Sequence, residues 1–188
     1  MSDHDLLDHK PSVYGSAPEK GVVASHTLCV IVDNEPGVLA RVIGLFSGRG
    51  YNIDSLTVAE VNHDKRLSRI TLVCSGTPPV IQQIKSQLGR LIPVRTVADL
   101  TIEGESVERE LALIKVKGSG DARVEALRVA GIFRARVVDS TIKSFVFEIT
   151  GATTKIDAFI ELMEPLGLID VSRTGVAAMK RGEKAIGE

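Results

Sequence analysis

The sequence lacks features that mark several common kinds of protein. Aromatic side chains make up 4% of its 188 residues and tryptophan is absent, which argues against the stacking platforms that bind single-stranded nucleic acid. The formal net charge of −1 gives no global field that would draw the chain to nucleic acid or anionic lipid. No apolar run approaches the roughly 18 residues of a membrane-spanning helix. The composition therefore predicts a soluble globular protein.

Reactive and metal-binding side chains are also scarce. The four histidines show no ligand spacing, so no metal site is predicted. No arrangement of Ser, His, Asp, Cys or paired carboxylates is organised for catalysis, so no catalytic residue is predicted. The N-terminus lacks the apolar segment of a signal peptide, which favours the cytoplasm. There, Cys29 and Cys74, each within an apolar run, are expected to be buried thiols, with a disulfide as the alternative.

Hydrophobic periodicity in the first half of the chain predicts the element order βαββαβ. The polar residues 1–25 are predicted to be a disordered tail. Thr77 is predicted to cap the second helix and Pro78 to occupy its first position. Strands are predicted at residues 26–32, 52–60, 67–74 and 94–100, and helices at residues 38–46 and 78–91. This is the ferredoxin-like order, in which two helices cover one face of an antiparallel sheet.

The second half repeats the order with little residue identity to the first. Asp121 is predicted to cap a helix with apolar positions Val124, Leu127 and Phe133, and Thr154 to start the other helix. Strands are predicted at residues 111–117, 136–140, 144–150 and 168–174. The predicted fold class is α+β.

Two ferredoxin-like βαββαβ domains, at residues 26–102 and 103–188, are therefore expected. A sheet that is covered by helices on one face leaves its other face and its edges without partners. Because units this small have little core of their own, association into a dimer is expected.

The turn Asp33–Gly37, of sequence DNEPG, joins the first strand to the first helix. Backbone N–H groups of Gly37, Val38 and Leu39 are left unpaired at such a helix start, where the helix dipole adds positive charge. A carboxylate suits this position. The side-chain amide of Asn34 can serve either end of a zwitterion.

A second amide, that of Asn52, opens the next predicted strand, and Ile53 beside it can line an apolar pocket. The same residues also fit purely structural roles. Asn34 can cap the helix, Gly37 can make the turn, and Asn52 can be a turn residue. The residues by themselves leave both interpretations open.

Several segments resemble a known family. NEPGVLARVIGLFSGRGYNIDSLTVA and RLSRITL are similar to ACT domains, which bind amino acids, and above all to those of bacterial acetohydroxyacid (acetolactate) synthase small subunits. VERELALIKVK, IFRARVVD, KIDAFIE and RTGVAAMKRG resemble the C-terminal domain of these subunits. The resemblance covers residues 26–184. It implies an ACT regulatory domain at residues 26–102 and a C-terminal small-subunit domain at residues 103–188.

The family resemblance implies a regulatory role in branched-chain amino-acid synthesis. Such a subunit activates a large catalytic subunit and confers feedback inhibition by valine. The large subunit, and not this chain, is expected to carry thiamine diphosphate, magnesium and FAD. The resemblance further implies a homodimer with valine between two ACT domains. The implied contacts are Asn34, Gly37, Val38 and Leu39 from one subunit and Asn52 and Ile53 from its partner.

Other functions fit the residues less well. A free-standing ACT sensor of another enzyme or of transcription is one alternative, although no helix-turn-helix is predicted, and a small ferredoxin-like enzyme is another. The glycine-rich loop Lys117–Asp121 can cradle an anion but lacks the Lys-Ser/Thr ending of a P-loop, so it is interpreted as a plain connection. Lys180, Arg181 and Lys184 are interpreted as a solvated basic cluster, with docking on an acidic patch of the large subunit as the alternative.

Overall fold

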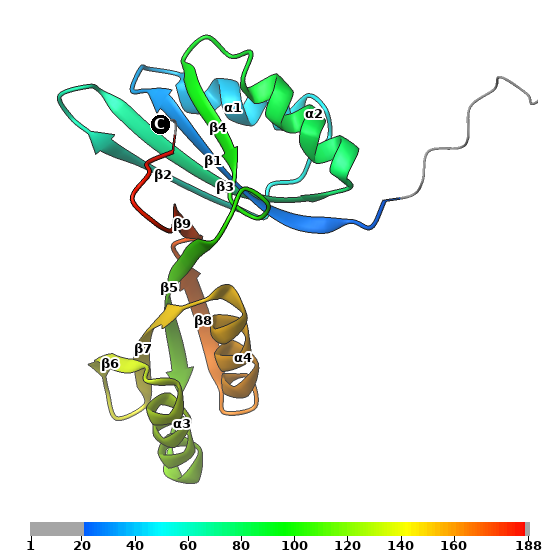
Figure 1. The fold of residues 1–188 in the computed structure, drawn as a ribbon. Coiled ribbons are helices and arrows are strands. Elements are labelled where there is room, and N and C mark those ends of the chain that lie inside the picture. The colour runs from blue at the N-terminus through cyan, green and yellow to red at the C-terminus, as the bar shows by residue number, and fades with distance from the viewer. Residues whose placement is uncertain (1–20, 187–188) are drawn as a thin grey trace, which may run out of the picture.

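Two antiparallel sheets, each with two helices on one face, make up the chain in the computed structural model, which describes residues 21–186 (Figure 1). The first sheet has the strand order β2-β3-β1-β4. Its elements are β1 (Ala24–Asp33), α1 (Val38–Ser47), β2 (Ser55–Asn62), β3 (Leu67–Gly76), α2 (Pro78–Leu88) and β4 (Val94–Asp99). This is the predicted ferredoxin-like order.

The first core lies between this sheet and its helices. Alternate residues of β1, Leu28 and Val30 among them, are fully buried and meet Phe46 of α1 and Leu88 of α2, as the period of two along a strand requires. Thr77 is the N-cap residue of α2 and is followed by Pro78, as predicted, although the Thr77 hydroxyl makes no capping hydrogen bond.

The second sheet has the corresponding order, β6-β7-β5-β8. Its elements are β5 (Ser106–Lys117), α3 (Gly120–Phe133), β6 (Arg136–Ser140), β7 (Ser144–Gly151), α4 (Thr153–Met163) and β8 (Leu168–Arg173). Phe145, Phe147 and Ile149 of β7 alternate on the buried face, as predicted. The α+β fold class and the two ferredoxin-like units are confirmed.

The apolar face predicted for α3 is confirmed at Phe133, which packs against Phe159 in the second core, and is wrong at the other two positions. Val124 and Leu127 are exposed, and the buried positions are Ala126, Val129 and Ala130. The helix packs through small residues because large side chains such as Phe147 and Phe159 already fill the shared core. The cap is also displaced, since Ser119 rather than Asp121 is the N-cap residue.

The predicted boundaries of the first and fifth strands differ from those observed. The predicted tail lies mostly outside the described residues, and its last two residues, Ala24 and Ser25, begin β1. Strand β5 begins at Ser106, five residues before the predicted start at Leu111. This extension has a partner that the periodicity did not indicate, β9 (Ala177–Lys180), which pairs with residues Ser106–Arg109.

The segment around β9 returns to the first sheet and covers part of the face that its helices leave open (Figure 1). Val176 and Ala178 are buried there against Cys29, Ala98 and Leu100. The dimer was expected because this face of the sheet lacked a partner. Part of the face is in fact covered by the chain's own C-terminal segment. Lys180, one member of the predicted basic cluster, belongs to β9.

Both cysteines are buried free thiols, as predicted. Burial raises the pKa of Cys74 to about 11, with further contributions from the charges of Asp54 and Asp99. Burial also raises the pKa of Cys29, partly opposed by the positive charge of Arg69. A raised pKa keeps a thiol protonated and therefore unreactive.

We expect both thiols to resist alkylation in the native protein. Because the pKa of Cys74 is raised to about 11, about one Cys74 thiol in a thousand is ionised at about pH 8. Labelling by iodoacetamide, followed by mass spectrometry, should leave the native chain unmodified and modify both cysteines in denaturant. Rapid labelling of the native chain at either position would contradict the buried assignment.

Candidate functional site

The turn between β1 and α1 leaves backbone donors facing open space. Gly37 is the N-cap residue of α1 in the left-handed region, with φ +81°. A Cβ placed on Gly37 would meet no atom within 4 Å. Glycine is needed here for its conformation, and the space before it is free for a ligand.

Two of the three predicted backbone donors are available. Within the described part of the chain, no group accepts a hydrogen bond from the N–H of Gly37 or Leu39, whereas Val38 donates to the Glu35 carbonyl at 3.3 Å. The prediction of three outward N–H groups is thus wrong for Val38, because the tight turn supplies an acceptor. Asn34 is fixed through its backbone N–H, which donates to the Arg66 carbonyl at 2.7 Å.

Asn52 and Ile53 lie in the loop before β2 and not in the strand itself, which starts at Ser55. The prediction that Asn52 opens the strand is therefore wrong by three residues. Asn52 is exposed, and its Nδ2 donates to Asp54 Oδ1 at 2.5 Å. Ser75 donates to the other carboxylate oxygen of Asp54 at 2.9 Å. Asp54 thus orients the Asn52 amide and leaves its carbonyl oxygen available to a ligand.

One chain does not bring the two groups of predicted residues together. The register pairs Asp33 of β1 with Leu67 and Thr27 with Val73, and Ser55 of β2 also pairs with Val73. Strands β1 and β2 therefore run parallel, with the turn at the end of β1 and the Asn52 loop at the start of β2. Six or seven residues of strand separate these ends, on the order of 20 Å.

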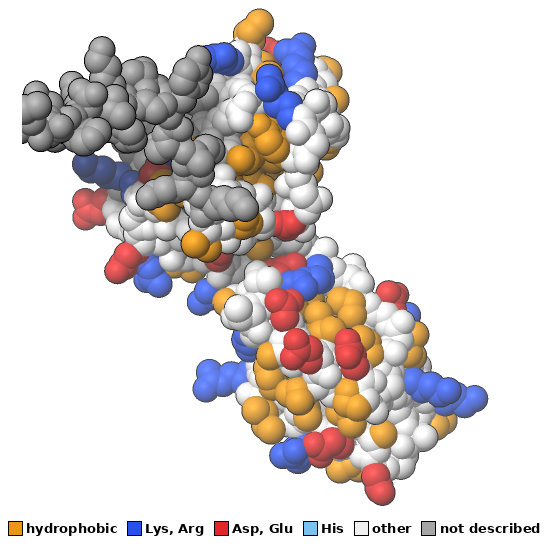
Figure 2. Space-filling view, turned by 90° about the vertical axis from the view of Figure 1, so that its right-hand side faces the viewer, with side chains coloured by type: hydrophobic (Ala, Val, Ile, Leu, Met, Phe, Trp, Pro, Cys, Tyr) orange, Lys and Arg blue, Asp and Glu red, His pale blue; other side chains and the backbone are white. Residues whose placement is uncertain are grey.

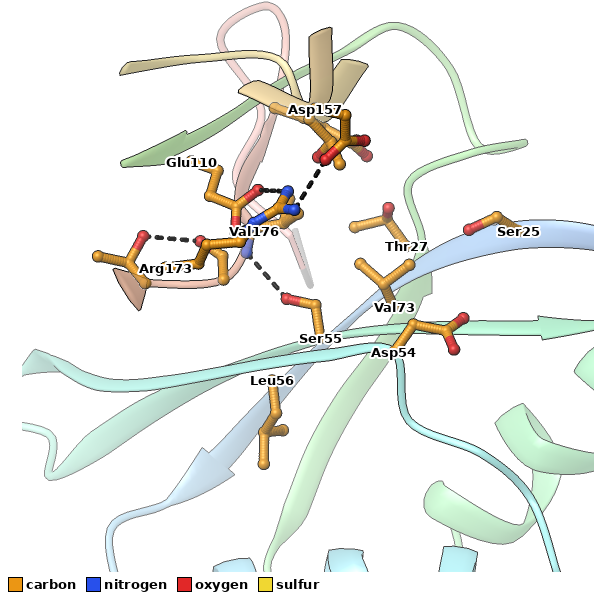
Figure 3. A pocket seen from close by; sticks show the side chains of 14 residues that line it. Ser25, Thr27, Asp54, Ser55, Leu56, Val73, Glu110, Asp157, Arg173 and Val176 are labelled. Carbon is orange, nitrogen blue, oxygen red and sulfur yellow. Dashed lines mark hydrogen bonds and ion pairs between the residues drawn. The ribbon is translucent and has the colours of Figure 1, made fainter. Parts of the chain in front are cut away.

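A cavity of about 620 Å³ opens where the two sheets meet (Figure 3). Asp54 and Ser55 line it from the first sheet, and Glu110, Asp157 and Arg173 line it from the second. It therefore begins two residues after Asn52 and extends to the C-terminal sheet. Sequence reasoning did not single out this junction.

Arg173, at the end of β8, binds acidic side chains of β5 and α4 at the cavity. Its Nε and Nη2 donate to the buried carboxylate of Glu110 at 2.9 and 2.6 Å, and its Nη1 donates to Asp157 at 2.7 Å. Hydrogen bonding to Glu110 raises the pKa of Arg173, against a smaller opposing effect of burial. This two-pronged pairing fixes the end of β8 against β5 and α4.

The last segment of the chain also contacts the start of β2. Val176 donates its N–H to Ser55 Oγ at 3.0 Å, and Thr57 Oγ1 donates to the Val176 carbonyl at 2.8 Å. These side chains were not predicted as functional. A glycine, Gly175, in the motif RTGVAAMKRG was the available signal, but its spatial neighbour cannot be read from local sequence.

Two family models match successive parts of the chain. A family model described as "AHAS small subunit-like ACT domain" matches residues 28–96, and one described as "Small subunit of acetolactate synthase" matches residues 109–182. The first match places the chain among ACT-domain proteins, the class to which its first ferredoxin-like unit corresponds.

Individual relatives narrow the assignment. A "Probable acetolactate synthase small subunit" of Archaeoglobus fulgidus is 48% identical over 85% of this chain and 98% of its own length. The acetolactate synthase small subunit of Haemophilus influenzae is 44% identical over 85% of this chain and 97% of its own length. The crystal structure of the small subunit from Thermotoga maritima is 36% identical, with a TM-score of 0.77, and the match covers 86% of this chain and 99% of that one.

The chain belongs to the family of acetolactate synthase small subunits. The resemblance noted from the sequence motifs is thereby confirmed. None of the helices in residues 21–186 is long and apolar enough to cross a membrane. In the same residues, no three side chains of His, Cys, Asp or Glu are placed to hold a metal ion together.

We expect Gly37→Ala to destabilise the protein by about 1 kcal/mol, because an L-residue in the left-handed region is strained even where its Cβ has space. Gly44→Ala is the matched control, since Gly44 lies on the exposed side of α1 and its Cβ would also meet nothing within 4 Å. The control should stabilise by about 0.5–1 kcal/mol, as alanine does within a helix. Urea unfolding measures both changes, and equal effects at the two positions would contradict the strained turn.

Proposed function

We propose that this chain is the regulatory subunit of an acetolactate synthase, activates a separate catalytic subunit and makes it sensitive to valine. The observation that carries the effector assignment is the turn at Gly37. At a helix start, in a member of the small-subunit family, it presents two N–H groups that have no acceptor among residues 21–186. Free N–H groups at a helix N-terminus suit the carboxylate of an amino acid.

Each end of valine has a suitable partner in this proposal. The carboxylate is bound by the N–H groups of Gly37 and Leu39, with the Asn34 amide beside them. The carbonyl oxygen of Asn52 accepts a hydrogen bond from the ammonium group, because Asp54 already holds the amide NH2 side. Ile53, half-buried at the edge of the first core, offers an apolar surface to the branched side chain. Val38 contributes packing rather than an N–H.

A homodimer completes the site in the proposal. Among the residues that the structure describes, β2 pairs with β3 alone, and half of its residues are exposed, so its outer edge has no strand partner there. If two such edges pair around a two-fold axis, the strands run antiparallel. The start of β2 in one protomer then lies beside the end of β2 in its partner. That end, at Asn62, is level with Asp33 through Leu67 of β3, so the dimer brings the two groups of residues toward each other.

The catalytic subunit is the proposed site of all chemistry. In this proposal it carries thiamine diphosphate, magnesium and FAD and condenses pyruvate, and the present chain contributes no catalytic residue. Valine inhibits because it binds one state of the complex better than another, and its effect is limited by that difference in affinity.

Calorimetry of the isolated chain against valine, leucine and isoleucine tests the effector directly. Valine is expected to bind in the millimolar range or tighter. In a parallel assay, the chain should raise the activity of a separately purified catalytic subunit and make that activity fall when valine is added. If both the activity and the valine response of the catalytic subunit stay unchanged, the proposed function is wrong.

Substitutions in the turn test the site. Asn34→Ala and Gly37→Asp should each relieve valine inhibition while the chain still stimulates its partner. Gly37→Asp places a negative charge and a strained Cβ where the carboxylate binds. Gly44→Asp adds the same charge on the exposed side of α1 and should keep valine inhibition. Normal inhibition in both turn variants would overturn the assigned residues.

A further inference from the structure

The C-terminal segment, residues 174–178, binds the start of β2 through both backbone groups of one residue. Val176 N–H donates to Ser55 Oγ and its carbonyl accepts from Thr57 Oγ1. Figure 3 shows Ser55 pointing from β2 toward Val176. Ser55 and Thr57 lie two residues apart and so face the same side of the strand. The two bonds therefore restrain that face of β2 against the segment.

The segment also approaches β2 too closely for a side chain. Gly175 has φ +82°, and a Cβ on it would lie 2.8 Å from Ser55 Oγ and 3.1 Å from Thr57 Cγ2. Glycine is therefore required for both conformation and contact. The close packing of this segment on β2 therefore depends on glycine at position 175.

Burial makes the contact costly to break. Val176 and Ala178 are each 5% exposed and pack on Cys29 and Leu100 of the first sheet. Arg69 of β3 adds a hydrogen bond from Nη1 to the Ala178 carbonyl at 3.3 Å. A buried backbone group that loses its partner is strongly unfavourable, so the segment and β2 are expected to move together.

The same segment is anchored in the second sheet. Arg173, three residues before Val176, binds Glu110 of β5 and Asp157 of α4. On the side of the first sheet, Val176 binds Ser55, and Asn52 lies three residues before Ser55. The hydrogen bonds of Arg173 and those of Val176, joined by short stretches of backbone, therefore connect the C-terminal domain to the loop that holds Asn52 and Ile53.

We propose that residues 174–178, together with Ser55 and Thr57, position the Asn52–Ile53 part of the effector site and couple its occupancy to the C-terminal domain. This inference rests on the proposed function for the identity of the effector. Coupling between two sites is reciprocal in free energy. Loss of the contact weakens effector binding, and effector binding strengthens the contact.

Thr57→Val is the variant that tests the contact, because it preserves shape and removes the hydrogen bond to the Val176 carbonyl. Thr101→Val is the matched control. Thr101 Oγ1 accepts a hydrogen bond from the Thr27 N–H at 2.9 Å, so the control removes one bond to the same sheet outside the contact. Calorimetry with valine should show roughly tenfold weaker binding in Thr57→Val and less than about twofold change in Thr101→Val.

Hydrogen exchange with mass spectrometry supplies a readout that does not need the effector. Peptides containing residues 51–57 should exchange faster in Thr57→Val than in Thr101→Val. In the unaltered chain, saturating valine should slow exchange at residues 174–178. The measurement with valine uses only the unaltered chain, so it tests the coupling even if Thr57→Val folds poorly.

The outcomes separate the two proposals. If the unaltered chain does not bind valine, the proposed effector is wrong, and faster exchange at residues 51–57 in Thr57→Val still supports the positioning role. If valine binds but leaves exchange at residues 174–178 unchanged, the coupling is overturned. Equal valine affinity and equal exchange in Thr57→Val and Thr101→Val would overturn the positioning role itself.

Discussion

The first sheet carries apolar side chains on the face that its helices leave open, and the burial of these side chains determines where the end of the chain lies. In the first sheet the side chains of Cys29 and Ala98 point away from the helices and are nevertheless buried. Their cover comes from Val176 and Ala178, about 80 or more residues later in the sequence. Because burial of apolar surface is the main favourable term in folding, the end of the chain is drawn back to its beginning.

That return has a structural consequence for the two lobes. Strand β5 extends beyond the second sheet, since its later residues pair with β7 and β8 and its first residues pair with β9, next to the first sheet (Figure 1). The two ferredoxin-like units are therefore connected in two ways. The chain runs directly from β4 to β5, and the segment around β9, which pairs with β5, packs against the first sheet. Figure 2 shows the second lobe from the side of its helices, with apolar and acidic side chains interspersed on its surface.

Much of the architecture could be predicted from local pattern. The alternating apolar residues of β7 and the helically spaced apolar residues of α4 each specify which face is buried. Any other orientation would expose a run of large apolar side chains. Helix α3 was predicted only in part, because Phe133 packs on the core whereas Val124 and Leu127 are exposed. Its buried residues are Ala126, Val129 and Ala130, and the space left for them depends on the aromatic residues across the core and not on the helix itself.

The candidate site divides in the same way. The sequence by itself determined the turn before α1, because glycine tolerates the positive φ that Gly37 adopts there and because the first N–H groups of any helix lack partners within the helix. It also determined the family. Tertiary structure alone decided that Val38 has its own acceptor, that Asn52 precedes its strand, and that Ser55 and Thr57 meet Val176. The contact of Ser55 and Thr57 with Val176 depends on groups far apart in the chain, whose meeting is set by the burial of both sheets. The acceptor for Val38 is only three residues away, but it depends on the exact geometry of the turn, which the residue types do not specify.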